Sequence, residues 1–218
     1  MASTAEQYMW FHHVAQQAYE CQRCSRMASH SAVLGPLNGR IESRVLFVGE
    51  APGRFGSATT RIPFHGDRSG DNFERLLPLA GLIRDEVFIT NAVMCNPTDE
   101  KGRNDRPTAH ELRNCSEYLR ELLDIVQPPH VVTLGQKALD ALGLLERHSV
   151  SLSRDAATGI PWRGTLLVPM YHPSARVVAV RGFERMSAEY RELGRILADA
   201  ADACSPSINE SVARTPHA

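Results

Sequence analysis

Short apolar runs alternate along this chain with stretches whose apolar positions have helical spacing. The runs lie at Arg44–Val48, Val87–Thr90, His130–Leu134 and Thr165–Met170. Continuous apolar runs bounded by turn residues indicate strands buried on both faces. Strands that alternate with helices are typical of a parallel sheet covered on both sides. We therefore predict an α/β fold: a three-layer α/β/α sandwich with a central, mostly parallel four-stranded sheet.

Helices are predicted between and around these strands. One begins with a capping box at Thr108 and Glu111 and reaches Val126. The segment Ser149–Gly164 has no helical or strand period and is predicted to be irregular. The other helices are predicted over Glu6–Glu20, from a cap at Ser69 or Asp71 to about Ala80, from Gly135 to Leu142, and over about Ser187–Ala201.

The length of 218 residues suits one well-buried core. We predict a single domain over residues 1–203 and a disordered polar tail over 204–218. The net charge of −1 gives no global basic signature, so any nucleic-acid contact must come from a local patch. No stretch has membrane-spanning length, and His12 and His13 stand where a signal peptide needs an apolar run. We expect a soluble, cytoplasmic monomer with no membrane partner.

Four residues lie within two positions of the end of a predicted strand. They are Glu50, Asn91, Gly135 and His172. The carboxyl ends of parallel strands lie along one edge of a sheet, where open α/β sheets bind their ligands. The sequence therefore predicts that these four residues converge in one cleft.

Cys21 and Cys24 have the spacing with which two thiolates bind one metal centre. Cys95 and Cys115 could complete a four-thiolate site, which leaves Cys204 as the odd cysteine. Inside a cell, cysteines are more often metal ligands or free thiols than disulfides. A four-cysteine site accepts zinc or an iron–sulfur cluster, and unligated thiols are the alternative. Such a site would join the N-terminal helix to the loop after Asn91.

An ordered set of motifs resembles the uracil-DNA glycosylase superfamily, and most of all its family-four enzymes, which carry an iron–sulfur cluster. The motifs are CQRC (21–24), VLFVGEAPG (45–53), IPFHGDRSG (62–70), ITNAVMC (89–95), Cys115 and YHPSARV (171–177). The resemblance covers Cys21 to Arg185. It implies a DNA repair enzyme that flips uracil out of DNA and hydrolyses the N-glycosidic bond, leaving an abasic site. It also implies a [4Fe-4S] cluster on Cys21, Cys24, Cys95 and Cys115, with zinc less favoured.

The resemblance implies a role for several side chains. Phe64 would stack on the flipped uracil, Asn91 would pair with the edge of the base, and His172 would donate to uracil O2. Glu50 is the candidate for orienting water or stabilising the cationic sugar. The residues that would line the substrate site with them are Gly49, Ala51, Pro52 and Gly53.

The chain departs from the family-four pattern at Arg54–Ser57, which replaces the acids that usually follow GEAPG. Ala51 stands where the best-known branch of the superfamily has the Asp that positions the attacking water, and the family-four enzymes share this absence. Asp67 and His65 are therefore alternative water activators. Gly53 lies where other branches have a Tyr that excludes the thymine methyl, and the candidates for this task are Arg54 and Phe55.

DNA contacts are expected from Ser174, Arg176 and Arg181, which follow His172. Lys101, Arg103 and Arg106, on the loop between Cys95 and Cys115, form either a second contact or a solvated charge run.

A covalently trapping relative has a histidine in this loop. Since EKGRNDR (100–106) has none, we expect turnover without covalent capture. Neither lysine, Lys101 or Lys137, lies in a Schiff-base context, so a monofunctional glycosylase is predicted.

Three other functions fit parts of the pattern. The small Gly53 suits a glycosylase for other deaminated or mismatched bases. The missing acids after GEAPG suit a non-catalytic uracil-DNA-binding protein. A four-cysteine zinc protein with an unrelated small-molecule site is the third alternative.

Overall fold

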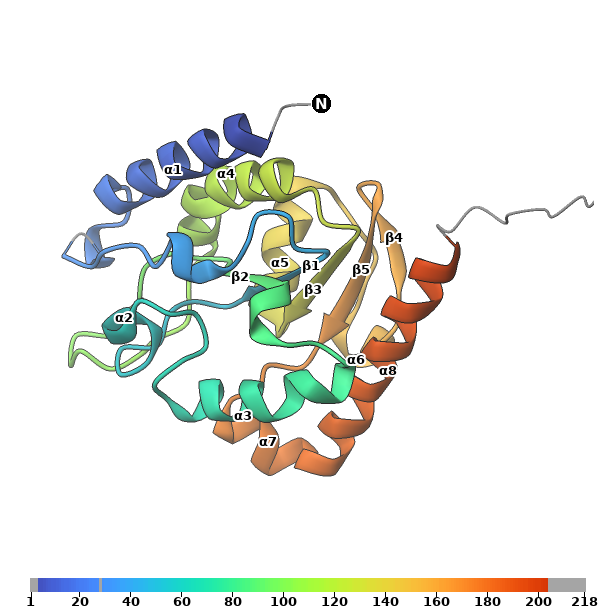
Figure 1. The fold of residues 1–218 in the computed structure, drawn as a ribbon. Helices are drawn as coiled ribbons and strands as arrows, with labels where there is room; N and C mark the ends of the chain where they lie inside the picture. The colour runs from blue at the N-terminus through green and yellow to red at the C-terminus, as the bar shows by residue number, and fades with distance from the viewer. Residues whose placement is uncertain (1–3, 28, 204–218) are drawn as a thin grey trace, which may run out of the picture.

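The computed structural model describes residues 4–27 and 29–203. Its centre is a sheet of strand order β2-β1-β3-β5-β4 (Figure 1). The predicted parallel strands are confirmed as β1 (Val45–Gly49), β2 (Val87–Asn91), β3 (His130–Leu134) and β5 (Thr165–Met170). Every residue of β1, β2 and β3 is buried, which explains their continuous apolar runs. The predicted tail, with Cys204, lies outside the described residues.

A fifth strand, β4 (Ile160–Trp162), corrects two predictions: a four-stranded sheet and an irregular segment over 149–164. β4 pairs antiparallel with β5, with Trp162 opposite Thr165. The two turn residues, Arg163 and Gly164, have positive φ angles of 49° and 73°, which match the twist of a tight hairpin. A three-residue edge strand with a central proline has no readable period, so the hydrophobic pattern misses it.

Helices cover both faces of the sheet, so the three-layer sandwich is confirmed (Figure 1). One core lies under α1 (Thr4–Glu20), α4 (Ala109–Val126) and α5 (Gln136–Leu145). The other lies under α3 (Arg68–Leu76), α7 (Ala175–Arg181) and α8 (Phe183–Ala203). Short helices α2 (Ser57–Thr60) and α6 (Leu152–Asp155) interrupt predicted loops. Within the described ranges, no helix has the length and apolarity needed to cross a membrane.

Two helix starts position the loops around the sheet edge. The capping box of Thr108 and Glu111 at α4 is present as predicted. At α3 the cap is Asp67, not Ser69 or Asp71, and its side chain accepts from the Gly70 N–H. Because Asp67 ends the long loop that follows β1, this cap decides where that loop meets α3.

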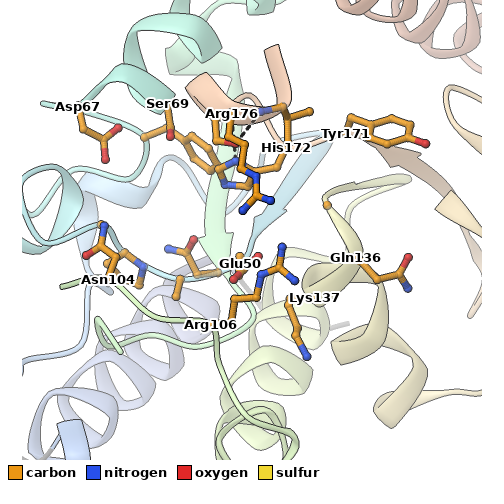
Figure 2. A pocket seen from close by; sticks show the side chains of 18 of the residues that line it. Glu50, Asp67, Ser69, Asn104, Arg106, Gln136, Lys137, Tyr171, His172 and Arg176 are labelled. Carbon is orange, nitrogen blue, oxygen red and sulfur yellow. Dashed lines mark hydrogen bonds between the residues drawn. The ribbon is translucent and has the colours of Figure 1, made fainter. Parts of the chain in front are cut away.

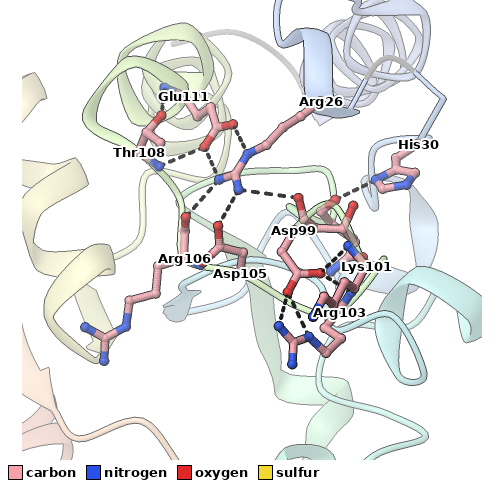
Figure 3. A network of polar contacts seen from close by, with 11 residues as sticks. Arg26, His30, Asp99, Lys101, Arg103, Asp105, Arg106, Thr108 and Glu111 are labelled. Atoms are coloured by element: carbon pink, nitrogen blue, oxygen red, sulfur yellow. Dashed lines mark hydrogen bonds and ion pairs between the residues drawn. The ribbon is translucent and has the colours of Figure 1, made fainter.

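The guanidinium of Arg26 connects the segment after α1 to α4 and to the loop before α4 (Figure 3). Its Nε and Nη2 donate to the two carboxylate oxygens of Glu111 at 2.6 and 2.8 Å. Its Nη1 donates to Asp105 Oδ2 at 2.6 Å, and Nη2 also donates to the Arg106 carbonyl at 2.8 Å. Glu111 is 5% exposed, and the hydrogen bond from Arg26 lowers the pKa of its carboxyl to about 2. This bidentate pair anchors the loop before α4.

We expect Glu111→Gln to lower the free energy of unfolding at pH 7 by about 2–3 kcal/mol, because the amide loses a charge-assisted hydrogen bond to Arg26. The folded-state pKa of Glu111 lies below its ordinary 4.5, so its contribution is present above pH 4.5 and is lost as the pH falls toward 2. Urea unfolding at pH 7 and pH 3 measures the difference between the two proteins. An equal difference at both pH values contradicts this account.

Candidate active site

A cleft of about 1110 Å³ opens at the carboxyl ends of the parallel strands (Figure 2). Its lining includes Glu50, Asn91, Gly135 and His172, each from the end of a different strand. The structure therefore brings together the four residues that the strand-end argument placed in one cleft. Ala51, Pro52, Gly53 and Phe64 also line it.

Gly49 lets two predicted site residues lie against the backbone of β1. A Cβ at this position would stand 2.5 Å from Asn91 Oδ1 and 2.8 Å from Phe64 Cε2. Gly49 pairs with Asn91 in the β1–β2 register, which places the Asn91 amide at the floor of the cleft. No hydrogen bond to this amide comes from any described residue, so its carbonyl and NH₂ groups face the cleft without a partner.

Phe64 has a left-handed backbone with a φ of +49°, which is uncommon for a residue with a side chain. Its N–H donates to Ser57 Oγ at 3.1 Å, and its carbonyl accepts from Arg84 Nη2 at 3.1 Å. Its ring centroid lies 4.9 Å from that of Phe73 and 5.4 Å from that of His172. These contacts hold a strained conformation of the kind that clusters at functional sites.

His172 has a defined tautomer. Its Nδ1 accepts the Ser174 N–H at 3.1 Å, so the neutral ring carries its proton on Nε2. Burial lowers the pKa of His172 to about 4, against an opposing effect of the Asp67 charge. Asn72 Nδ2 donates to the Pro173 carbonyl at 2.9 Å and holds the following turn in place. His172 is thus a neutral hydrogen-bond donor at physiological pH.

Glu50 lies near two cationic side chains, Arg106 and Lys137 (Figure 2). Burial raises the pKa of Glu50, while the charges of Arg106 and Lys137 lower it. Sequence reasoning missed Lys137 and its neighbour Gln136 as cleft residues. Both directly follow Gly135 at the end of β3, so the strand-end rule was the signal that could have found them.

Asp67 occupies the space beside two glycines. While Oδ1 accepts from the Gly70 N–H at 3.0 Å, Oδ2 lies 2.6 Å from the position of a Cβ on Gly53 and close to one on Gly56. The place where a side chain of residue 53 would stand is therefore filled by a carboxylate. Asp67 lines the cleft, whereas the lining does not include His65, Arg54 or Phe55.

The loop over 96–106 is tied to the GEAPG turn by two asparagines. Asn96 Nδ2 donates to the Pro52 carbonyl at 2.6 Å and to Asn104 Oδ1 at 3.1 Å. Asn104 Oδ1 also accepts from the Arg54 N–H at 2.9 Å. Both asparagines line the cleft, and neither was predicted, because their meeting depends on the paths of two loops.

The three residues predicted to contact DNA all line the cleft, but two of their side chains already have partners within the protein. Arg176 is exposed, whereas Ser174 caps α7 by accepting the Val177 N–H. Arg181 Nε donates to Glu189 at 3.0 Å, and its guanidinium lies 3.5 Å from the Tyr171 ring centroid. On the other side of the cleft, Arg106 lines it, while Lys101 and Arg103 do not. Arg103 forms an ion pair with Asp99.

The four predicted metal-ligating cysteines come from three segments that meet beside α4. Burial raises the pKa of Cys115 to about 12 and that of Cys95 to about 11, and nearby thiols of the same group raise both further. Asn114 Nδ2 donates to Cys24 Sγ at 3.3 Å. In the part of the chain that the structure describes, no three His, Cys, Asp or Glu side chains are arranged to hold a metal ion.

Comparisons with known proteins identify the family of the chain. The family model of the uracil DNA glycosylase superfamily matches residues 36–199. A Type-5 uracil-DNA glycosylase of Pyrobaculum aerophilum is 32% identical over 194 residues, covering 76% of this chain and 83% of the relative. A Type-4 uracil-DNA glycosylase of Thermotoga maritima is 32% identical over 163 residues, covering 74% of this chain and 80% of the relative. A Type-4 uracil-DNA glycosylase of Archaeoglobus fulgidus is 26% identical over 188 residues, covering 84% of this chain and 91% of the relative. The chain belongs to the uracil DNA glycosylase superfamily, as its motifs predicted.

Proposed function

We propose that this protein is a monofunctional uracil-DNA glycosylase, which hydrolyses the bond between uracil and deoxyribose and leaves an abasic site. The observation that carries the proposal is the convergence of Phe64, Asn91 and His172 in one cleft of a chain of this superfamily. The relatives named as uracil-DNA glycosylases support the same activity. Uracil-containing DNA is then the partner, and the enzyme works inside the cell; the monomeric state stays a prediction.

Phe64 and Asn91 form the base-binding part of the site. The Phe64 ring stacks on the flipped uracil, and its rigid placement limits the entropy lost on binding. The Asn91 amide accepts from uracil N3–H and donates to O4. The partners of this amide come from the base itself, because the described residues supply none. Ala51, Pro52 and Gly53 line the space proposed for the base, whereas Gly49 acts indirectly, by leaving room for Asn91 and Phe64.

His172 stabilises the leaving group. Cleavage of the N-glycosidic bond gives an oxocarbenium-like sugar and a uracil anion. The neutral imidazole donates its Nε2 proton as a hydrogen bond to O2, where negative charge develops. A low pKa keeps the ring neutral, so it donates without bringing a second positive charge next to the sugar.

Glu50 is the proposed anionic group of the site. Its carboxylate orients the attacking water or stabilises the cationic sugar, and Arg106 and Lys137 favour its ionised form. Asp67 is the second carboxylate that lines the cleft and the alternative water activator. Arg176, Ser174 and Arg106 are proposed to contact DNA phosphates. Arg181 supports them through Glu189 and Tyr171.

A second candidate function rests on Gly53. The position has no aromatic side chain to exclude a 5-methyl group, and the Asp67 carboxylate stands beside it instead. A glycosylase of this kind accepts other deaminated or mismatched bases as well. Duplexes that carry hypoxanthine, xanthine or a thymine mismatch in place of uracil distinguish the two functions by the base that is released.

We also propose that Cys21, Cys24, Cys95 and Cys115 hold a [4Fe-4S] cluster. The donor set fits, because four thiols from three segments lie close together: besides burial, the thiols of Cys21 and Cys24 raise the pKa of Cys95 and Cys115, and a cationic cluster core would relieve that repulsion. The cluster would link the end of α1 to the loop after β2. Its contribution is structural: it stiffens the loop that carries Asn96, Asn104 and Arg106.

We expect His172→Ala and Asn91→Ala each to lower the single-turnover rate of uracil release by about a hundredfold to a thousandfold, since each removes a group aimed at the base. A labelled uracil oligonucleotide, treated with alkali after incubation, reports the abasic site. His13→Ala, an exposed histidine on α1, should keep full activity. A fully active His172→Ala, or DNA that stays intact while bound to the wild-type protein, refutes the mechanism.

The pH profile should follow Glu50 and not His172. Because the pKa of Glu50 is raised above 4.5, the rate should fall on acidification before an ordinary glutamate would protonate, and Glu50→Gln should be slower and lack this fall. His172, with a pKa of about 4, should give no step near 6.5. Single-turnover rates between about pH 8 and pH 5 measure both. A step near 6.5 that persists in Glu50→Gln contradicts the neutral donor.

Protein purified without oxygen should show visible absorbance and contain about four iron atoms and four sulfides per chain. Cys115→Ser should lose the absorbance and unfold at lower temperature, whereas Cys204→Ser should keep both. Metal analysis that finds one zinc and no iron would replace the cluster with a zinc site.

A further inference from the structure

Phe55 is a large apolar side chain that the site chemistry leaves unused. It is 72% exposed, although it lies in the loop between β1 and α2, within two residues of the cleft-lining Gly53 and Ser57. We propose that Phe55 is a stacking platform for the DNA base next to the flipped uracil on the same strand. This inference rests on the proposed function and adds a binding subsite outside the cleft.

The loop holds Phe55 in a defined place. The N–H groups of Gly56 and Ala58 both donate to the Gly53 carbonyl at 3.1 Å. Thr59 Oγ1 donates to the Arg54 carbonyl at 2.8 Å, and Arg54 N–H donates to Asn104 Oδ1 at 2.9 Å. An aromatic ring on a hydrogen-bonded turn loses little conformational entropy when a ligand covers it.

Arg54 gives the ring a polar partner suited to DNA. Its guanidinium carbon lies 4.2 Å from the centroid of the Phe55 ring, in cation–π distance. Its Nη1 donates to the Gly102 carbonyl, which holds the charge beside the ring. An aromatic ring with an adjacent cation is the combination that binds single-stranded nucleic acid without regard to sequence.

Phe55 lies two residues from Gly53 and two from Ser57, both of which line the cleft, and this nearness to the cleft indicates what could cover the ring. The nucleotide that enters the cleft stays joined to its neighbours by the sugar–phosphate backbone, so a neighbouring base must lie at the rim. This base has lost its stacking partner because the uracil has left the stack. Arg106 and Arg176, both cleft-lining, favour the same polyanion over an apolar protein partner.

The test measures binding separately from excision. Wild type, Phe55→Ala, Phe55→Trp and a control, Ile83→Ala, are titrated with an oligonucleotide that carries a cleavage-resistant 2′-fluoro-deoxyuridine beside 2-aminopurine. Ile83 is 57% exposed and lies just before the start of β2, whereas the cleft lies at the carboxyl ends of the strands. We expect Phe55→Ala to bind about fivefold to a hundredfold more weakly and to lose the quenching of 2-aminopurine. Phe55→Trp should restore both, and Ile83→Ala should resemble wild type.

Uracil excision at saturating DNA should stay within about threefold of wild type in Phe55→Ala, because the ring does not line the cleft. Binding by Phe55→Ala within twofold of wild type overturns the inference, as does a Trp variant as weak as the Ala variant. Phe55-dependent dimerisation in gel filtration, with unchanged DNA binding, shows a self-association surface and also overturns it. Failure of the wild type to excise uracil would instead refute the proposed function, since base quenching is read without cleavage.

Discussion

The end of strand β1 has room for no side chain. The Asn91 amide and the Phe64 ring both lie where a Cβ of Gly49 would stand, so the two side chains proposed to bind the base lie against bare backbone. This steric constraint needs the parallel register of β1 with β2, which puts Asn91 beside Gly49. It also needs the left-handed backbone of Phe64, which hydrogen bonds from Arg84 and to Ser57 maintain.

Electrostatics divides the cleft into two regions. On one side, His172 is kept neutral by burial and oriented by the Ser174 amide, so it contributes a dipole and no charge. On the other, Glu50 is kept within reach of ionisation by Arg106 and Lys137. In the proposed reaction, bond cleavage separates charge in the same sense, with negative charge on the base and positive charge on the sugar. The site is organised before the substrate arrives, which lowers the cost of reorganisation.

The hydrophobic pattern was sufficient to predict the parallel strands, and with them the convergence of Glu50, Asn91, Gly135 and His172, because strand ends share an edge in any such sheet. The same rule predicts Gln136 and Lys137 once it includes the first three residues after each strand. It does not reach β4, whose pairing depends on the turn at Arg163 and Gly164. It does not predict Asn96 and Asn104 either, because their hydrogen bonds with Pro52 and Arg54 join two loops, and such bonds leave no period in the sequence. The hydrophobic pattern thus predicts the architecture, whereas the details of the site depend on loop geometry.

The contact between Asp67 and Gly53 has an evolutionary consequence. One carboxylate caps α3 and fills the space above residue 53, so a bulky residue there collides with it, and loss of the carboxylate alone removes a helix cap. Neither single change leads to a well-packed intermediate. The two positions form an epistatic pair that must change together. A lineage with a carboxylate at position 67 is therefore separated by a fitness valley from one with a bulky side chain at position 53.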